Sequence, residues 1–438
     1  MKVQNKIFIV FFILISFASF SQTPEKNLEK YQLYRERLKY FYKLGTNPGE
    51  CQYASISGMF PPYAKRLNFG GDQTIEMAWF IGVMATEFKL QAHNKQDINK
   101  TLRDLYYALL AYKRLDECED KEPWNLPVSR FDGFFMRGDM PSKTFIKENA
   151  KAFNKDITPV DTFGSASAGT PFWVENTRFH NSEMSQDQAI HILMGMSLVV
   201  KCFPDKKFKF TGIDGEKILF NFHNFSKEVV RLMISYIKNE NKTYGPKEWI
   251  IYEPSGKKLD LGGDATFFSY GFSKVGQKIT GKNYIKDINK KISARLLWEM
   301  AKLPTPNEWN TSMACILAAI GDSWGCIQGT DKAIYSTSKK YYWDTYYILL
   351  WQFMNNKRSS YLNKKLLNNQ LDSAPENGTY FYGEEFGSKP EGGWASNNRF
   401  RNTKKEQLGR DHFKGNYNGL DFMLLYNLYQ LTKDSVNN

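Results

Sequence analysis

Two acidic residues are the first candidates for chemistry in this chain. Asp139 belongs to the glycine-containing segment RFDGFFMRGDM, and Asp187 stands at the start of the helical pattern SQDQAIHILMGMSLV. A protonated and an ionised carboxyl group can act together as general acid and general base, and hydrolysis of a glycosidic bond uses such a pair. Asp139 and Asp187 are therefore the candidate catalytic pair, with Asp264, Asp344 and Glu384 in reserve.

A second set of residues fits proton abstraction instead. A lyase that acts on uronate sugars needs a base such as His or Tyr, and a cation that holds the sugar carboxylate. The chain contains five histidines. Two of them, His180 and His412, occur in long polar and aromatic segments together with Arg137 and Arg410. Both chemistries remain open from the sequence.

Aromatic residues make up 16% of the chain, which is enough for a core and for a binding cleft. Sugar rings have apolar faces and hydroxyl edges, so a glycan site combines aromatic rings with short polar groups. Trp173, Tyr342, Trp343 and Trp394 are candidate stacking surfaces, although burial in the core is the more frequent fate of a single Trp. The expected substrate-binding residues are Asp72, Gln73, Arg137, Trp173, His180, Gln188, Asp264, Trp343, Asp344, Trp394, Arg399, Arg410 and His412.

Most of these residues fall in two long segments without a helical pattern, at 124–184 and 372–417. Loops of this length in a compact protein are either functional or disordered. Their many Trp, Tyr and Phe residues argue against disorder. The sequence therefore predicts that these segments carry function.

The rest of the chain is dominated by helical periodicity, and strand patterns are sparse. Some of the helical stretches are apolar on nearly all sides, while others carry charge on one face, so buried helices covered by outer ones are expected. The expected helices span 25–44, 73–93, 98–115, 186–203, 217–239, 265–280, 284–303, 311–320, 343–355 and 420–432.

The starts of the apolar helices resemble one another. Each places Asp or Asn in or near the first turn, where such a residue also caps free N–H groups and suits the positive helix end. Six similar starts indicate six equivalent units whose helix starts point to a common place. The segments are FGGDQT, MSQDQA, LGGDAT, NEWNTS, YYWDTY and YNGLDF.

With this pattern the chain resembles the six-hairpin (α/α)6 toroids, the architecture of many secreted glycoside hydrolases and polysaccharide lyases. The resemblance covers roughly residues 25–432 and concerns architecture and helix starts, without the catalytic signature of a named family. It implies an all-α fold in which residues 22–438 form one toroid domain, closed by the helix at 25–44. It also implies that the inner helix starts and the loops before them line one end of a central funnel.

The N-terminus has the composition of a cleavable signal peptide. Lys2 and Lys6 precede the apolar run at 7–17, and the small residues Ala18, Ser19 and Ser21 follow. Cleavage before Gln22 is expected, so that residues 1–21 are removed and the protein is periplasmic or extracellular. The run is shorter than the ~20 residues that cross a bilayer. No later segment predicts a transmembrane helix.

The net charge of +13 comes from scattered lysines rather than from one basic element. This distribution indicates a solvated surface with some preference for acidic glycans or a cell envelope, and it argues against nucleic acid. Five cysteines show no CxxC and no metal-ligand spacing; Cys315 and Cys326 are the closest pair. We expect neither a metal nor a cofactor.

The sequence therefore favours a secreted carbohydrate-active enzyme, with a glycoside hydrolase ahead of a lyase. Its partner would be a poly- or oligosaccharide, possibly acidic. The alternative from another class is a non-catalytic helical protein that binds glycans or an envelope partner.

Overall fold

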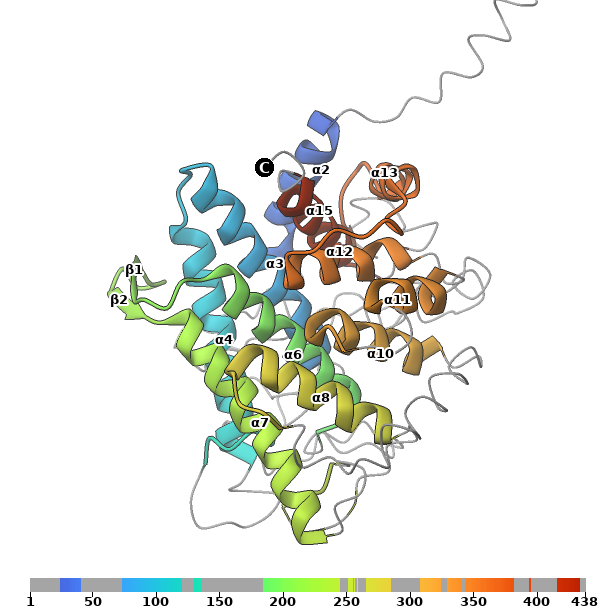
Figure 1. The fold of residues 1–438 in the computed structure, drawn as a ribbon. Helices are drawn as coiled ribbons and strands as arrows, with labels where there is room; N and C mark the ends of the chain where they lie inside the picture. Colours follow the sequence, from blue (N-terminus) through green and yellow to red (C-terminus); the bar gives the residue numbers. More distant parts are fainter. Residues whose placement is uncertain are drawn as a thin grey trace, which may run out of the picture.

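The computed structural model describes residues 24–40, 73–119, 130–135, 184–244, 251–254, 256, 258, 265–284, 308–323, 329–339, 343–381, 394 and 416–433. This part of the chain is mostly helical, with 11 α-helices and little strand (Figure 1). The prediction of an all-α protein is confirmed. Among the described residues, no helix combines the length and apolar character that a membrane crossing requires.

The elements follow one another from the N-terminal α2 to the C-terminal α15. They are α2 (Pro24–Arg37), η1 (Leu38–Tyr40), α3 (Gln73–His93), α4 (Asn99–Glu119), α6 (Gln186–Cys202), β1 (Phe208–Thr211), β2 (Lys217–Phe220), α7 (Phe222–Tyr244), α8 (Ala265–Thr280), α10 (Glu308–Gly321), α11 (Thr330–Ser338), α12 (Asp344–Asn355), α13 (Lys364–Ser373), β3 (Tyr380–Phe381), β4 (Asn416–Tyr417) and α15 (Leu420–Lys433).

One expected helix start is wrong. The predicted helix at 217–239 begins five residues later, at Phe222, because residues 217–220 form strand β2. This strand pairs antiparallel with β1, and Gly215 turns the chain between them at φ 83°. Alternating burial along both strands directs Phe210 and Ile218 inward, which is the two-residue period of a strand. The expected helix at 284–303 lies outside the described residues except for Tyr284.

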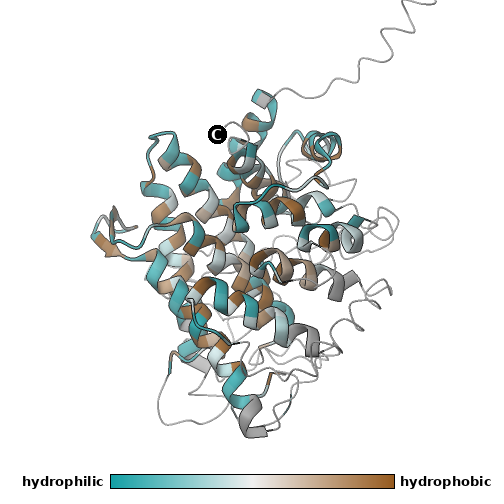
Figure 2. Ribbon diagram, in the orientation of Figure 1, coloured by the Kyte–Doolittle hydropathy of each residue, from teal (hydrophilic) through white to brown (hydrophobic). Residues whose placement is uncertain are grey.

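Six helices form the inner part of the fold: α3, α6, α8, α10, α12 and α15. In α3 and α6 nearly every described side chain from the first turn to the penultimate turn is buried, and the described residues of α10 and α12 are similar. A helix that is apolar on all sides requires neighbours on all sides. Hydrophobic residues accordingly concentrate where the helices face one another (Figure 2).

The inner helices run in the same direction. Trp79 of α3 contacts His191 of α6, and Phe88, further along α3, stacks on Phe203 directly after α6. Because the contacts follow the same order in both segments, α3 and α6 are parallel. The same holds for α3 and α15, where Glu76 pairs with Asn418 and Thr86 with Asn427. The starts of these helices consequently lie at one end of the molecule.

The same direction holds for the remaining inner helices. Tyr346 and Asn356, at the two ends of α12, contact Met194 and Lys201 of α6 in the same order. Gly271 of α8 lies against Leu317 of α10, one turn before Lys274 meets Gly321. The ends of α8 and α10 also meet the end of α12, because Asn355 accepts from Lys278 and donates to the Ala319 carbonyl. The six inner helices therefore share one orientation.

The outer helices run back along the inner ones. Thr101, near the start of α4, donates a hydrogen bond to Glu87 near the end of α3. α7 packs on α6 and α8, α11 on α10 and α12, and α13 on α15. The first helix, α2, lies beside the last, because Tyr31 contacts Tyr426 and Tyr34 contacts Phe422.

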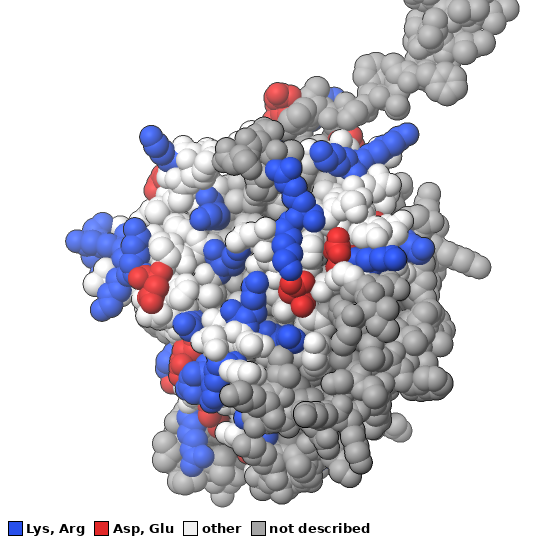
Figure 3. Space-filling view, viewed as in Figure 1, with Lys and Arg blue, Asp and Glu red and all other residues white. Residues whose placement is uncertain are grey.

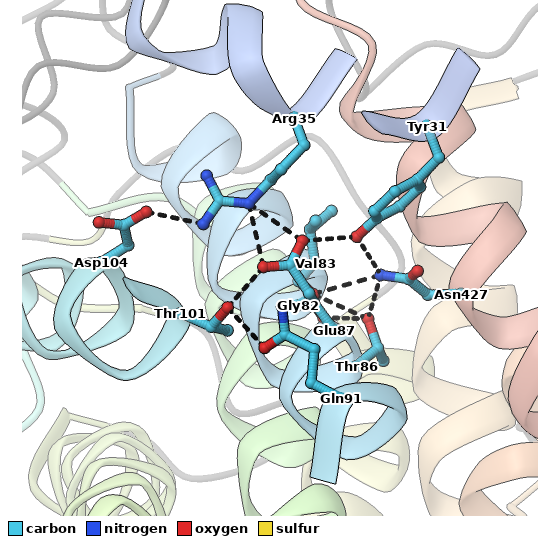
Figure 4. A network of polar contacts seen from close by, with 10 residues as sticks. All are labelled: Tyr31, Arg35, Gly82, Val83, Thr86, Glu87, Gln91, Thr101, Asp104 and Asn427. Carbon is cyan, nitrogen blue, oxygen red and sulfur yellow. Dashed lines mark hydrogen bonds and ion pairs between the residues drawn. The ribbon is translucent and has the colours of Figure 1, made fainter. Parts of the chain in front are cut away.

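Helix α2 is fixed by a buried network of charged and polar groups (Figure 4). The guanidinium of Arg35 donates to the Glu87 carboxylate at 3.0 Å and to the Asp104 carboxylate at 2.7 Å. Burial alone would lower the pKa of Arg35, but these two carboxylates outweigh it and raise that pKa. Arg35 therefore joins α2 to α3 and α4 as a permanent cation.

The network continues to the last helix. Tyr31 donates to Glu87 at 2.8 Å, and the Asn427 amide donates to Tyr31 at 3.0 Å and to Thr86 at 3.1 Å. On the other side of α2, the Lys30 ammonium donates to the carbonyl oxygens of Leu371, Asp372 and Ala374 at 2.9, 3.3 and 2.9 Å. These carbonyls lie at the end of α13, so α2 links the first helical pair to the last.

We expect Arg35→Ala to lower the free energy of unfolding by about 3–5 kcal/mol, because it leaves two buried carboxylates without their cation. The matched control is Arg231→Ala, which removes an exposed ion pair with Glu228 and is expected to cost less than about 1 kcal/mol. Urea unfolding followed by circular dichroism measures both values. Equal losses in the two variants would show that the α2 network does not hold the fold.

A close approach between α3 and α6 provides a second test. A Cβ at Gly195 would lie 2.7 Å from the carbonyl oxygen of Ala78, which is backbone and cannot move aside. We expect Gly195→Ala to lower the free energy of unfolding by about 1–3 kcal/mol. At Gly82 a Cβ meets side-chain atoms alone, of Leu198 at 3.0 Å and of Leu424 at 3.5 Å. Gly82→Ala is expected to be near neutral, because Ala favours helix by ~1 kcal/mol. Thermal unfolding of the two variants measures the difference, and a loss of equal size in both would contradict it.

Candidate functional site

Four buried carboxylic acids lie in the first turns of inner helices. Glu76 is near the start of α3, Asp187 of α6, Asp344 of α12 and Asp421 of α15, and each is at most 3% exposed. The partial positive charge of a helix start stabilises a carboxylate there. Because the helices share one orientation, the four acids lie at the same end of the fold. We call this group, with the aromatic rings beside it, the helix-start cluster.

At the start of α6, two polar side chains contact Asp187. The Ser185 hydroxyl donates to the Asp187 carboxylate, two residues further along the chain. Nδ1 of His191 lies 2.6 Å from the Asp187 carbonyl oxygen, so the proton of a neutral imidazole is on Nδ1. That tautomer leaves Nε2 of His191 as an acceptor, which is the state required of a base.

At the start of α12, burial changes the acidity of Asp344. Burial raises the pKa of this carboxyl, while hydrogen bonds from the backbone N–H groups of Asp344 and Thr345 oppose the rise. A carboxyl group with a raised pKa can stay protonated and act as a general acid. Asp344 therefore has the environment of a proton donor.

Aromatic rings pack together near the start of α12. Trp343 and Trp394 pack edge to face with their centroids 5.3 Å apart, and Trp343 also lies at 6.3 Å from Tyr346. Tyr346 stacks on Trp79 of α3 at 5.1 Å, and Trp79 lies 6.4 Å from His191. Trp79 thus connects the start of α12 with the start of α6.

At the start of α15, Asp421 and Asn418 complete the cluster. Tyr417 donates to the Asp421 carboxylate at 2.8 Å, and the Asn418 amide donates to Glu76 of α3 at 2.8 Å. Gly419 permits this turn, because its φ is 75° and a Cβ there would lie 2.3 Å from Tyr34. The turn before α15 therefore holds two of the four acids in place.

The predicted site residues divide into two groups. Asp187, Gln188, Trp343, Asp344 and Trp394 lie at the helix-start end and are buried, and Gln73 is the first residue of α3. The two tryptophans are 2% and 3% exposed, so in this structure they pack against protein rings. The residues outside the described part are Asp72, Arg137, Asp139, Trp173, His180, Asp264, Tyr342, Glu384, Arg399, Arg410 and His412.

The segment that precedes Asp139 is described as far as residue 135. The Asp116 carboxylate at the end of α4 accepts hydrogen bonds from the backbone N–H groups of Asp132 and Gly133, at 2.9 and 3.1 Å. Gly133 has a φ of 102°, and a Cβ there would clash with the backbone of α7 at Met233. Asp116 therefore fixes where the segment that carries Asp139 leaves the helical core.

Sequence reasoning overlooked several members of the cluster. His191 lies four residues after Asp187, so the two share a helix face, and Glu76 follows the predicted residue Asp72 at the same spacing in the sequence. Searching for acids or bases at this spacing from each helix start would have found both. Trp79 carries no such signal, since its position is typical of a core residue.

Metal and thiol chemistry find no support in the described part of the chain. There, no group of three or more His, Cys, Asp and Glu side chains is arranged to hold a metal ion. Cys202 and Cys315 are buried free thiols, so Cys315 is not bridged to Cys326. Burial raises the pKa of Cys202 to about 12 and the pKa of Cys315 further, which makes both thiols unreactive.

Comparison with known proteins gives no relative. No protein family, no curated protein and no solved structure matches the chain. The chemistry of the helix-start cluster must therefore be argued from its own residues.

The raised pKa of Asp344 predicts a pH-dependent stability. An acid whose pKa is higher in the folded state loses its stabilising contribution as the pH rises through that pKa. We therefore expect Asp344→Asn to raise the melting temperature relative to the wild type at pH 8, and to raise it less, or not at all, at pH 5. Thermal unfolding at the two pH values measures this. A melting temperature that falls at both would indicate that Asp344 is needed as a structural carboxylate.

Proposed function

We propose that this protein is an exported (α/α)6 toroid that hydrolyses glycosidic bonds at its helix-start end. The packing of the inner helices supports the architecture. α3 contacts α6, α6 contacts α8, and the contacts continue through α10 and α12 to α15, which returns to α3. Helix α2 covers the junction between the last and the first members (Figure 1).

The observation that carries the proposed chemistry is the gathering of acids with different environments at one end of parallel helices. Asp344 has a raised pKa and serves as the general acid. Asp187, which accepts a hydrogen bond from Ser185, serves as the ionised base or nucleophile. Asp139 remains the alternative partner of Asp187. Glycoside hydrolysis requires one protonated and one ionised carboxyl group.

The proposed substrate is a poly- or oligosaccharide, and the net charge of +13 favours an acidic one. Gln188, Trp343 and Trp394 are buried against protein in this structure, so we do not assign them to sugar contact. In this proposal residues 1–21 are removed on export, and the mature protein acts in the periplasm or outside the cell without a cofactor or nucleic acid.

A polysaccharide lyase is the second candidate, and one observation favours it. The contact between His191 Nδ1 and the Asp187 carbonyl leaves Nε2 as the basic nitrogen of a buried imidazole. A base in this state can abstract the proton beside a uronate carboxylate. Unsaturated products distinguish this reaction from hydrolysis.

The test is activity of the chain from Gln22 onward on a panel of neutral and uronic polysaccharides. New reducing ends and the absorbance of unsaturated uronates are followed in parallel. We expect new reducing ends without unsaturation, and a rate that falls about 10²–10⁴-fold in Asp187→Asn and in Asp344→Asn, because acid–base groups contribute on that scale.

The matched control is Asp331→Asn, which changes the same residue type in the first turn of the outer helix α11 and is expected to keep the activity. Unsaturated products that disappear in His191→Gln would indicate that the protein is a lyase and not a hydrolase. Binding of a polysaccharide without turnover would instead indicate a non-catalytic glycan-binding protein.

A further inference from the structure

Three lysines meet at the end of the fold opposite the helix-start cluster. Lys201 and Lys278 lie in the last turns of α6 and α8, and Lys89 lies one turn before the end of α3. These inner helices share one orientation, so their ends lie on the same side of the molecule. On the face shown in Figure 3, Lys and Arg side chains predominate over this region, and Asp and Glu are few.

Two of the ammonium groups are held by neighbouring amides. Lys201 donates to the side-chain oxygen of Asn356 at 2.8 Å, and Lys278 donates to that of Asn355 at 2.9 Å. Asn355 is oriented for this role, because its amide nitrogen donates to the carbonyls of Ala319 and Trp351. Adjacent residues at the end of α12 therefore hold the two lysines close together.

The third lysine, Lys89, is close enough for its charge to affect Lys201. Burial lowers the pKa of Lys201, and the charges of Lys278 and Lys89 lower it further. None of the ion pairs formed within the described part of the chain includes any of the three lysines. The negative ends of the helices offset part of the mutual repulsion, and a bound anion would offset the rest.

The surroundings of the three lysines favour a hydrophilic polyanion over a lipid surface. Binding to a bilayer interface uses exposed apolar side chains that enter the headgroup region. The exposed large hydrophobic residues among those described are Leu28, Ile213 and Leu219, which belong to α2 and to the β1–β2 hairpin. The ends of α3, α6 and α8 present charged and amide groups instead.

We propose that Lys89, Lys201 and Lys278 form a binding site for an acidic polysaccharide, and that each lysine faces a carboxylate or sulfate group of one chain. Asn355 and Asn356 position two of the lysines, and the site is separate from the helix-start cluster. It does not depend on the proposed hydrolysis, because binding at this end requires no turnover at the other.

The test compares two triple variants of the chain from Gln22 onward. The first carries Lys89→Gln, Lys201→Gln and Lys278→Gln. The second carries the same change at Lys26, Lys100 and Lys364, which are exposed lysines on other helices. Both variants lose the same net charge, so a difference between them reports position alone.

The probes are heparin and polygalacturonate, with neutral dextran and vesicles that contain phosphatidylglycerol as comparisons. We expect the Kd for the two acidic polymers to rise about tenfold or more in the first variant and less than about threefold in the second, with binding that weakens as salt is added. Acetylation of the wild-type lysines gives a readout without mutation. Polygalacturonate should protect Lys89, Lys201 and Lys278 more than Lys26, Lys100 and Lys364.

Each of the other outcomes would contradict the proposed polysaccharide-binding site. Equal weakening in the two variants would mean that net charge alone attracts the polymers. No binding to either polymer at low salt would remove the site, and equal protection of all six lysines would do the same. Vesicle binding that depends on the three lysines, without polymer binding, would assign this face to a membrane.

Discussion

The ion pairs of Arg35 with Glu87 and Asp104 are the interaction on which the arrangement of the other helices depends. A charged group is costly to bury unless its partners are buried with it, so Arg35 is stable in this position only when α3 and α4 are already packed together. Tyr31 and Asn427 extend the same requirement to α15. The hydrogen bonds of Lys30 extend it to the end of α13. Helix α2 can therefore dock only when the first and the last helical pairs are in place.

The acids at the helix starts combine structural and chemical roles. A carboxylate in the first turn is stabilised by the helix dipole, which accounts for Asp187 and Asp421 without any reaction. Asp344 differs, because burial raises its pKa although backbone N–H groups point at it. A protein that keeps a carboxyl group in such an environment gives up some stability, and enzymes do so where a proton must be donated. The raised pKa of Asp344 is the physical reason for proposing a proton donor at this end of the fold.

Much of the helical architecture followed from periodicity, because buried helices are apolar on all sides and several carry an acidic residue in the first turn. The start of α7 did not, since the KILF strand at 217–220 is apolar enough to be taken for a helix until its pairing with β1 is known. The positions of Asp187 and Asp344 in first turns could be predicted, because a helix start is a local signal. Glu76, Trp79 and His191 could not be distinguished from core residues, because their importance comes from neighbours on other helices. Likewise, nothing near Arg35 in the chain indicates that its partners are 52 and 69 residues away.

The position of α2 has a consequence for the order in which the molecule folds. Lys30 finds its acceptors 341 to 344 residues later in the chain, and Tyr31 finds Asn427 396 residues later. Contacts between such distant segments close long loops and form late, because their entropy cost precedes any gain. During synthesis from the N-terminus, α2 therefore emerges long before α13 and α15, on which it packs. The first of the described helices is therefore the one that docks last, and until α15 has appeared the nascent protein exposes the apolar faces of Tyr31 and Tyr34.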